Sequence, residues 1–287
     1  GLFVVDNAYL PVHVAPHRPN TTVVQVWHAV GALKRFGLDT ASPPLEPERT
    51  FLHRHYDYVI AAGEAARGPY SAALRTPLER VLALGAARTD LFFDAEAMAA
   101  ARERILAAYP RLADGRVILY APTFRGRGRT RQAAPGLDAG RLRAALPADH
   151  LLVLKSHPNL DPALTPIGGF DVVVEPGVEI NELFMVSDVL ITDYSSSIFE
   201  WALLRRPLVL LTGDLAEYES DPGLYLDYRT EMIGTQVPDT DGVIAAILSG
   251  RFDLTAYDAF IARHLDACDG LAADRFVDRF LPEPPPR

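Results

Sequence analysis

Short apolar runs alternate along the chain with longer stretches in which apolar residues recur every three or four positions. The runs have the length and β-branched composition of buried parallel strands, whereas the longer stretches have the period of amphipathic helices. The pattern predicts strands at residues 2–5, 23–27, 58–61, 81–84, 117–120, 151–154, 171–174, 189–192 and 208–211. It predicts helices at residues 48–55, 95–108, 139–145, 180–186, 198–205, 243–248 and 272–280. This alternation predicts an α/β fold with parallel sheets, in which ligands bind at the carboxyl ends of the strands.

The segment 188–200 combines a predicted strand, a polar turn and a helix. Asp193 follows the strand, and Ser195, Ser196 and Ser197 begin the helix. Serines at this position cap the free N–H groups of the first helical turn, and the same N–H groups can hold a phosphate. The segment is therefore either an anion site beside a carboxylate or an ordinary serine N-cap.

Polar side chains follow three further predicted strands. His28 comes after Val-Val-Gln-Val-Trp, Thr123 and Arg125 come after Val-Ile-Leu-Tyr-Ala-Pro, and Lys155 and His157 come after Leu-Leu-Val-Leu. Because ligands of parallel sheets bind at the carboxyl ends of strands, polar clusters at four strand ends predict a binding site.

Composition narrows the class of protein. The chain has 287 residues, enough for one large or two medium domains, and its 49% hydrophobic content is ordinary for a globular protein. The net charge of −9 argues against a general nucleic-acid binder, and the single cysteine, Cys268, excludes an internal disulfide. We expect no membrane span, because no run of eighteen apolar residues occurs, and no signal peptide, because the first residues lack a basic region.

A domain boundary is predicted near residues 85–93, ahead of a long alanine-rich helix. It divides the chain into a first domain at residues 1–90 and a second at residues 91–287. Residues 125–131 are a basic stretch interrupted by glycines, and residues 281–287 are a proline-rich tail that cannot continue a helix.

Five motifs occur in order along the chain. They read QVWHAVGALKRFG at 25–37, GAARTD at 85–90, YAPTFR at 120–125, KSHP at 155–158 and DVLITDYSSSIFE at 188–200. Together they resemble the CDP-glycerol glycerophosphotransferase family, which includes teichoic-acid primases and polymerases and related capsule enzymes. The resemblance implies a GT-B-like fold of two Rossmann-like lobes with the active site between them. It also implies transfer of glycerol phosphate, or a related polyol phosphate, from a CDP-activated donor to a hydroxyl acceptor, with release of CMP.

The chain departs from the family pattern in three places. Ala29 stands where relatives usually have glycine, and Ala87 stands where they usually have proline. Relatives also have several more β/α units before the Trp-His motif, whereas 27 residues precede His28 here. We therefore expect the N-terminal, acceptor-side lobe to be truncated.

The resemblance implies catalytic roles for His28 and Asp193. His28 would be the general base, because a histidine titrates near neutrality; the alternative is a structural histidine. Asp193 would orient a histidine or stabilise the turn. Lys34 would hold an anionic acceptor, with an ordinary surface lysine as the alternative.

The donor is expected on the second lobe. Lys155 and His157 would bind its phosphate oxygens, although His157 could instead be a structural turn residue. Arg125 would clamp a phosphate, and Thr123 would lie near the donor.

The predicted helix of the fifth motif would complete the donor site. Ser195, Ser196 and Ser197 would hold the pyrophosphate through the N–H groups of the helix. Glu200 would accept hydrogen bonds from the ribose hydroxyls, with a helix-capping carboxylate as the alternative.

No tightly bound cofactor and no metal site are expected. Asp214, Glu217, Glu219 and Asp221 form an acidic segment, for which a solvated loop is the favoured interpretation and a divalent cation such as Mg²⁺ the alternative. The expected partners are CDP-glycerol or a similar CDP-polyol, and a lipid-linked or polymeric polyol-phosphate or glycan acceptor, but no nucleic acid. These partners imply a cytoplasmic protein, with peripheral association at the cytoplasmic face of the membrane as an option.

Two other functions stay open. A nucleotide-sugar glycosyltransferase can be built on the same two-lobe plan, because a fold does not dictate a reaction. The short first lobe also leaves open a donor-binding module that lacks turnover.

Overall fold

The computed structural model describes residues 1–42, 44–126, 132–156 and 167–281. These residues form two compact units, each with its own parallel sheet and core. The first unit comprises Gly1–Asp94, Ala216–Tyr228 and the segment from Asp258 onward, and the second comprises Ala95–Leu215 and Arg229–Tyr257. No described helix is long and apolar enough to cross a membrane.

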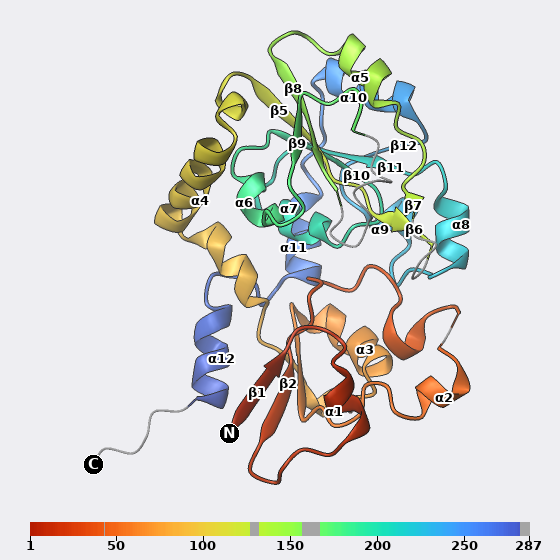
Figure 1. Cartoon of the computed structure of the whole chain (residues 1–287), viewed down its shortest axis with the longest axis vertical. Coiled ribbons are helices and arrows are strands. Elements are labelled where there is room, and N and C mark those ends of the chain that lie inside the picture. The colour runs from red at the N-terminus through yellow and green to blue at the C-terminus, as the bar shows by residue number, and fades with distance from the viewer. Residues whose placement is uncertain (43, 127–131, 157–166, 282–287) are drawn as a thin grey trace. The chain divides into compact units, whose positions relative to one another are not determined.

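The first unit contains a four-stranded sheet whose strands follow their order in the chain. These are β1 (Leu2–Val5), β2 (Thr22–Gln25), β3 (Tyr58–Ala61) and β4 (Val81–Ala83), and all neighbours are parallel. Its helices are α1 (Leu10–Val14), α2 (Glu46–Arg49), α3 (Glu64–Ala73), α8 (Leu215–Ser220), α11 (Tyr257–His264), α12 (Ala272–Phe280) and the short η1 (Gly37–Asp39), η2 (Leu78–Arg80) and η3 (Ala87–Phe93). Figure 1 labels most of these elements.

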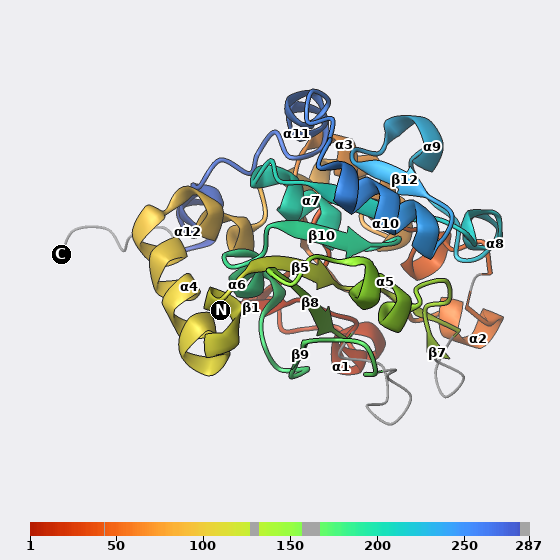
Figure 2. The same ribbon diagram turned by 90° about the horizontal axis from the view of Figure 1, so that it is seen from above.

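The second unit has a six-stranded parallel sheet in the order β12-β11-β10-β5-β8-β9. Its strands are β5 (Arg116–Tyr120), β8 (His150–Lys155), β9 (Val172–Val174), β10 (Val189–Thr192), β11 (Leu208–Leu211) and β12 (Thr235–Val237), with a small antiparallel pair, β6 (Phe124–Arg125) and β7 (Gln132–Ala133). The helices are α4 (Ala95–Ala108), α5 (Ala139–Ala145), α6 (Ile180–Phe184), α7 (Ser197–Leu203), α9 (Tyr228–Glu231), α10 (Thr240–Ser249) and η4 (Pro110–Ala113). This is the doubly wound Rossmann order, which reverses direction between β5 and β10. Figure 2 shows β10, β5 and β8 following one another across the sheet.

Both faces of this sheet are covered, which explains why its strands read as continuous apolar runs. On one face, Ile118 and Leu152 pack in a single buried cluster with Leu142 of α5 and Val243 of α10. Among the fully buried aromatics, the Trp201 ring of α7 packs edge-on to Phe184 at 4.9 Å between centroids.

The nine predicted strands are all present, with ends that differ by no more than two residues. The helix predicted at 48–55 is wrong: α2 ends at Arg49, and His53 and His55 have φ values of +56° and +67°. A left-handed residue cannot continue a right-handed helix, so the segment turns instead. The sequence also missed α3, because Pro69 lies inside it and proline disfavours a helix interior.

The division into units differs from the boundary placed at residue 90. The first long segment of the first unit does end nearby, at Asp94, but two later segments return to that unit. Asp90 explains part of this return, because its carboxylate accepts hydrogen bonds from the N–H groups of Ala272 and Ala273 at 3.1 and 2.8 Å. Helix α12, expected in the second lobe, is therefore anchored to η3 of the first unit.

A buried histidine pair lies in the first unit. His13 Nε2 is 2.8 Å and His53 Nδ1 is 3.3 Å from the hydroxyl of Tyr56, and all three side chains are buried. Burial lowers the pKa of His13 and lowers the pKa of His53 to about 4, where the nearby His13 and Arg75 add to the effect. The folded chain therefore binds fewer protons than the unfolded chain, in which histidine titrates near pH 6.5.

Acid should destabilise the first unit through this pair. Because the folded pKa of His53 is depressed, its contribution to stability is full above pH 6.5 and is lost as the pH falls toward about 4. The loss for His53 is roughly 3 kcal/mol at most. Thermal unfolding measured from pH 7.5 to 4.5 should show it, and His53→Asn, which tolerates a left-handed backbone, should reduce the pH dependence. His55→Asn is the matched control; an equal effect of both variants would contradict the assignment to His53.

Candidate active site

The polar residues predicted at strand ends in the second unit lie at, or one strand away from, the point where the strand order reverses. Thr123 and Arg125 follow β5, Lys155 ends β8, and Asp193 follows β10. The strands β10, β5 and β8 are direct neighbours, so these residues emerge at the same edge. The edge is held together by Thr192, whose hydroxyl donates to the carbonyl of Ala121 at 2.6 Å. Its position is the one at which doubly wound sheets bind ligands.

Asp193 is the centre of a buried hydrogen-bond network. The side chain is 4% exposed and accepts from both the N–H (2.8 Å) and the hydroxyl (2.9 Å) of Thr123. Its Oδ2 also forms an ion pair with Nη1 of Arg125 at 2.9 Å. Asp193 thus ties the segment after β5 to the end of β10.

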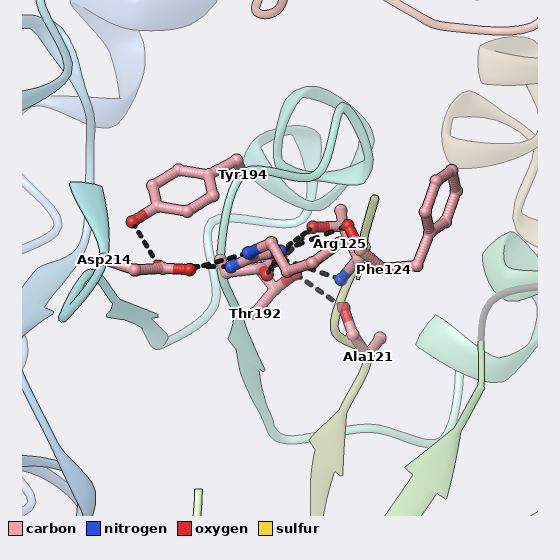
Figure 3. Close-up of polar contacts among 8 residues, drawn as sticks. Ala121, Phe124, Arg125, Thr192, Tyr194 and Asp214 are labelled. Carbon is pink, nitrogen blue, oxygen red and sulfur yellow. Dashed lines mark hydrogen bonds and ion pairs between the residues drawn. The ribbon is translucent and has the colours of Figure 1, made fainter. Parts of the chain in front are cut away.

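Asp214 closes the network from the end of β11. Arg125 donates to it in a bidentate manner, from Nε at 2.7 Å and from Nη2 at 3.2 Å, and Tyr194 donates its hydroxyl at 2.9 Å (Figure 3). The guanidinium also lies over the ring of Tyr194, 5.1 Å from its centroid. Burial would raise the pKa of Asp214, but the hydrogen bond and charge of Arg125 hold it below its usual value. Burial and the neighbouring Asp214 raise the pKa of Tyr194, so it stays a hydrogen-bond donor.

This network changes the interpretation of one predicted site residue, Arg125. Arg125 was expected to clamp a donor phosphate, yet it forms ion pairs with Asp193 and Asp214. A phosphate at Arg125 would have to compete with these carboxylates. Sequence reasoning named Asp214 only as part of an acidic segment and missed both its pairing with Arg125 and the role of Tyr194. The available signal was that Asp214 follows the predicted strand at 208–211, as the other site residues follow theirs.

In the serine turn, residues 195–197, the three hydroxyl groups differ in their hydrogen bonds. Ser195 Oγ lies 2.8 Å from Ser197 Oγ and accepts from the N–H of Ser197 at 3.2 Å. Ser196 is the N-cap residue of α7, but its side chain makes no capping hydrogen bond. Ser195 therefore provides the local cap, and the predicted phosphate role of the three serines stays a prediction.

Glu200 of α7 and Lys155 at the end of β8 are both buried. Glu200 is 3% exposed and accepts from Nδ2 of Asn181 at 3.3 Å, so Asn181 is a further residue that the sequence did not single out. The ammonium of Lys155 donates to the backbone carbonyls of Pro176 at 2.6 Å and Glu175 at 3.3 Å, and burial lowers its pKa. His157 lies outside the described residues.

His28 lies at the end of β2 in the first unit, on a strained turn. Trp27 has a φ of +53°, and its N–H donates to Oε1 of the buried Gln25 at 2.8 Å. The imidazole of His28 lies against the Trp27 ring at 4.4 Å between centroids, although the residue as a whole is exposed. Its Nδ1 is 3.3 Å from the carbonyl oxygen of Asp6, and Arg88 donates to the carbonyl of His28 at 3.3 Å.

The surroundings favour a neutral imidazole. Desolvation lowers the pKa of His28, the cations Arg88 and Lys34 lower it further, and Asp6 opposes them. Lys34 pairs through its backbone with Leu224, and its ammonium lies 5.6 Å from the centroid of the Tyr218 ring. His28 is thus suited to accept a proton at neutral pH.

No group of three or more His, Cys, Asp or Glu side chains suited to a metal ion occurs in the described part of the chain. In the acidic segment, for which a solvated loop was the favoured interpretation, Asp214 forms an ion pair with Arg125.

The comparisons with known proteins bear on the whole chain. The family model described as CDP-Glycerol:Poly(glycerophosphate) glycerophosphotransferase matches residues 2–281. The chain belongs to this family. The resemblance inferred from the five motifs is therefore confirmed.

Two curated relatives of the family come from Bacillus spizizenii. The chain is 36% identical to a teichoic acid poly(ribitol-phosphate) polymerase, over 98% of this chain and 46% of the relative. It is 32% identical to a teichoic acid ribitol-phosphate primase, over 96% of this chain and 74% of the relative. The chain thus spans about half the length of the polymerase.

A solved structure of the same kind supports the fold. A variant of the wall teichoic acid polymerase TagF soaked with CDPG matches with a TM-score of 0.77 and 25% identity, over 97% of this chain and 71% of that chain. The prediction of a GT-B-like α/β fold with parallel sheets is confirmed.

The network around Asp193 should dominate the stability of the second unit. Arg125→Met would leave the 4% exposed Asp193 side chain without its counter-charge, so we expect a loss of about 3–5 kcal/mol in the free energy of unfolding. Arg104→Met is the control, because its ion pair with Glu182 is exposed at the arginine and should cost less than about 1 kcal/mol. Urea unfolding followed by circular dichroism measures the free energy of unfolding of both variants. Similar losses for Arg125→Met and Arg104→Met would contradict a dominant contribution of the Asp193 network to stability.

Proposed function

We propose that this chain transfers a polyol phosphate from a CDP-activated donor to a hydroxyl acceptor during the synthesis of a teichoic-acid or capsule-type polymer. The match of the family model to residues 2–281 carries this proposal. Curated relatives are named for ribitol phosphate and for glycerol phosphate, so either polyol is compatible with the family. The acceptor is expected to be a lipid-linked or polymeric polyol phosphate or glycan, used at the cytoplasmic face of the membrane.

The proposed reaction is an in-line displacement at the phosphorus that bears the polyol. His28 takes the proton from the acceptor hydroxyl, and the oxygen forms a bond to that phosphorus. The bond between this phosphorus and the bridging oxygen breaks, and CMP leaves with the electron pair. The product is a phosphodiester between acceptor and polyol. Positioning and stabilisation of charge supply most of the rate in such transfers.

The second unit would hold the donor. Ser196 has a hydroxyl not used for capping, and Lys155 has one ammonium N–H beyond the two backbone bonds, so both can meet phosphate oxygens. Glu200, braced by Asn181, would accept from the ribose. Arg125 and Asp193 would act mainly by holding Thr123 and the strand ends in place.

The donor base should be cytosine. In a thermal-shift comparison, CMP, CDP-glycerol and CDP-ribitol should stabilise the protein more than UDP-glucose or UDP-GlcNAc. A ligand at a hundred times its Kd adds about 2.7 kcal/mol. Greater stabilisation by the UDP-sugars would instead favour a nucleotide-sugar glycosyltransferase.

His28→Ala should retain donor binding and lose transfer by about 10²–10⁴-fold, the usual contribution of a positioned base. The measurement is CMP release from a CDP-polyol in the presence of a polyol-phosphate acceptor. Because the pKa of His28 is lowered, transfer by the unaltered protein should decline only below pH 6.5, where the base becomes protonated.

His17→Ala serves as the control for this variant, because His17 is also a histidine of the first unit and pairs with Asp57 at 3.1 Å. Near-normal transfer by a folded His28→Ala protein would remove the base assignment. CDP-polyol binding without any CMP release by the unaltered chain would support the binding-module alternative.

A further inference from the structure

A cavity of about 220 Å³ lies in the second unit beside the Asp193 network. Tyr120 and Thr123 line it from the end of β5, and Leu154 and Ser156 line it from the end of β8. Thr123 is also the residue that Asp193 holds, and Ser156 follows Lys155 directly. The cavity therefore adjoins the expected donor site and shares Thr123 with it.

Two hydroxyl groups of the cavity are unused. Tyr120 is 6% exposed, and its hydroxyl has no hydrogen-bond partner among the described residues. The Tyr120 hydroxyl oxygen is not among the fully buried side-chain oxygens of the described residues that lack a hydrogen bond, so it is accessible from the cavity. Ser156 likewise makes no side-chain hydrogen bond within the described part of the chain. Both hydroxyls are therefore available to a polar ligand in the cavity, as donors and as acceptors.

The remaining walls are mostly apolar, with one carboxylate among them. The ring of Phe170 lies nearly parallel to that of Tyr120, at 4° and 6.1 Å between centroids, and Leu137 and Leu154 extend the apolar surface. The charged lining residue is Asp138, whose Oδ1 caps α5 by accepting from the N–H of Arg141 at 2.9 Å. A cavity with a carboxylate and no cation in its described lining disfavours a phosphate and suits a neutral ligand with hydroxyl groups and C–H faces.

The volume of the cavity limits the number of heavy atoms in that ligand. An apolar cavity of about 150 Å³ holds benzene, which has six heavy atoms, so a cavity of this volume holds roughly nine. A three-carbon polyol has six heavy atoms, whereas a five-carbon polyol has ten, one of which is the oxygen shared with the phosphate.

We propose that this cavity binds the polyol chain of the donor, and that it selects a five-carbon polyol over glycerol. The proposal rests on the function proposed above and adds the polyol to it. Tyr120 and Ser156 make hydrogen bonds to hydroxyls of the chain, and the Phe170 side packs on its carbons. Burial, reinforced by the charge of Asp193, raises the pKa of Tyr120, so its hydroxyl remains a donor.

Tyr120→Phe tests the hydrogen bond without disturbing the fold, because the lost hydroxyl has no protein partner among the described residues. Isothermal titration of CMP, CDP-glycerol and CDP-ribitol should show that the unaltered chain prefers CDP-ribitol to CDP-glycerol. The variant should bind CDP-ribitol about 3- to 10-fold more weakly, the loss expected for one neutral hydrogen bond, and should bind CMP unchanged.

Gly168→Leu tests the volume. Gly168 lines the cavity, and a Cβ at this position meets no atom of the described residues within 4 Å, so a leucine there can extend toward the cavity. It should abolish the preference for CDP-ribitol and leave CMP binding intact. Gly68→Leu is the matched control, because its Cβ is equally unobstructed and it does not line the cavity.

The outcomes distinguish a failure of the cavity assignment from a failure of the proposed function. If CMP binds but neither variant changes the polyol preference, the cavity assignment fails while the function stands. If donor affinities are unchanged and only transfer is lost, the cavity serves the acceptor and the proposal is overturned. If no cytidine nucleotide binds the unaltered chain, the proposed function itself fails, and the polyol assignment fails with it.

Discussion

The burial of Asp193 is the constraint on which the strand-end site depends. A carboxylate in this position is stable only when it is paired, and its partners come from the segment after β5. Thr123 supplies two hydrogen bonds and Arg125 supplies the counter-charge, across the point where the strand order reverses. The course of residues 121–125 therefore follows from the need to satisfy one buried charge, and the adjoining cavity follows from that course.

The same network determines where negative and positive charge lie within the candidate site. Two carboxylates, Asp193 and Asp214, surround one guanidinium, so this corner has an excess of negative charge and is a poor place for a phosphate. The hydroxyl of Ser196, which makes no capping hydrogen bond, and the ammonium of Lys155 lie on other elements of the same edge, the turn before α7 and the end of β8. An anionic group would thus be attracted to the serine turn and to Lys155, and kept from Arg125.

In the first unit, backbone strain has a comparable role. Trp27 adopts a left-handed conformation that costs a bulky residue about 1–2 kcal/mol. The cost is offset by the hydrogen bond to Gln25 and by stacking of the Trp27 ring on Phe36 at 4.8 Å. The turn directs His28 away from the core, which leaves its imidazole accessible while Trp27 partly desolvates it. Strain held in place by its surroundings in this way is typical of functional sites.

The periodicity of apolar residues was sufficient for the nine strands and for an α/β fold with parallel sheets, because burial of a parallel sheet on both faces demands continuous apolar runs. The five motifs were sufficient for the family, and the rule that ligands bind at strand ends led to polar residues that the structure places at one edge of the sheet. Contacts between residues far apart in the chain could not be read in this way. The pairing of Asp214 with Arg125, the support of Glu200 by Asn181 and the anchoring of α12 by Asp90 join segments 19 to 182 residues apart, so no local pattern records them. Whether a polar side chain at a strand end faces a ligand or neutralises another buried charge depends on such partners, and the fold alone brings them together.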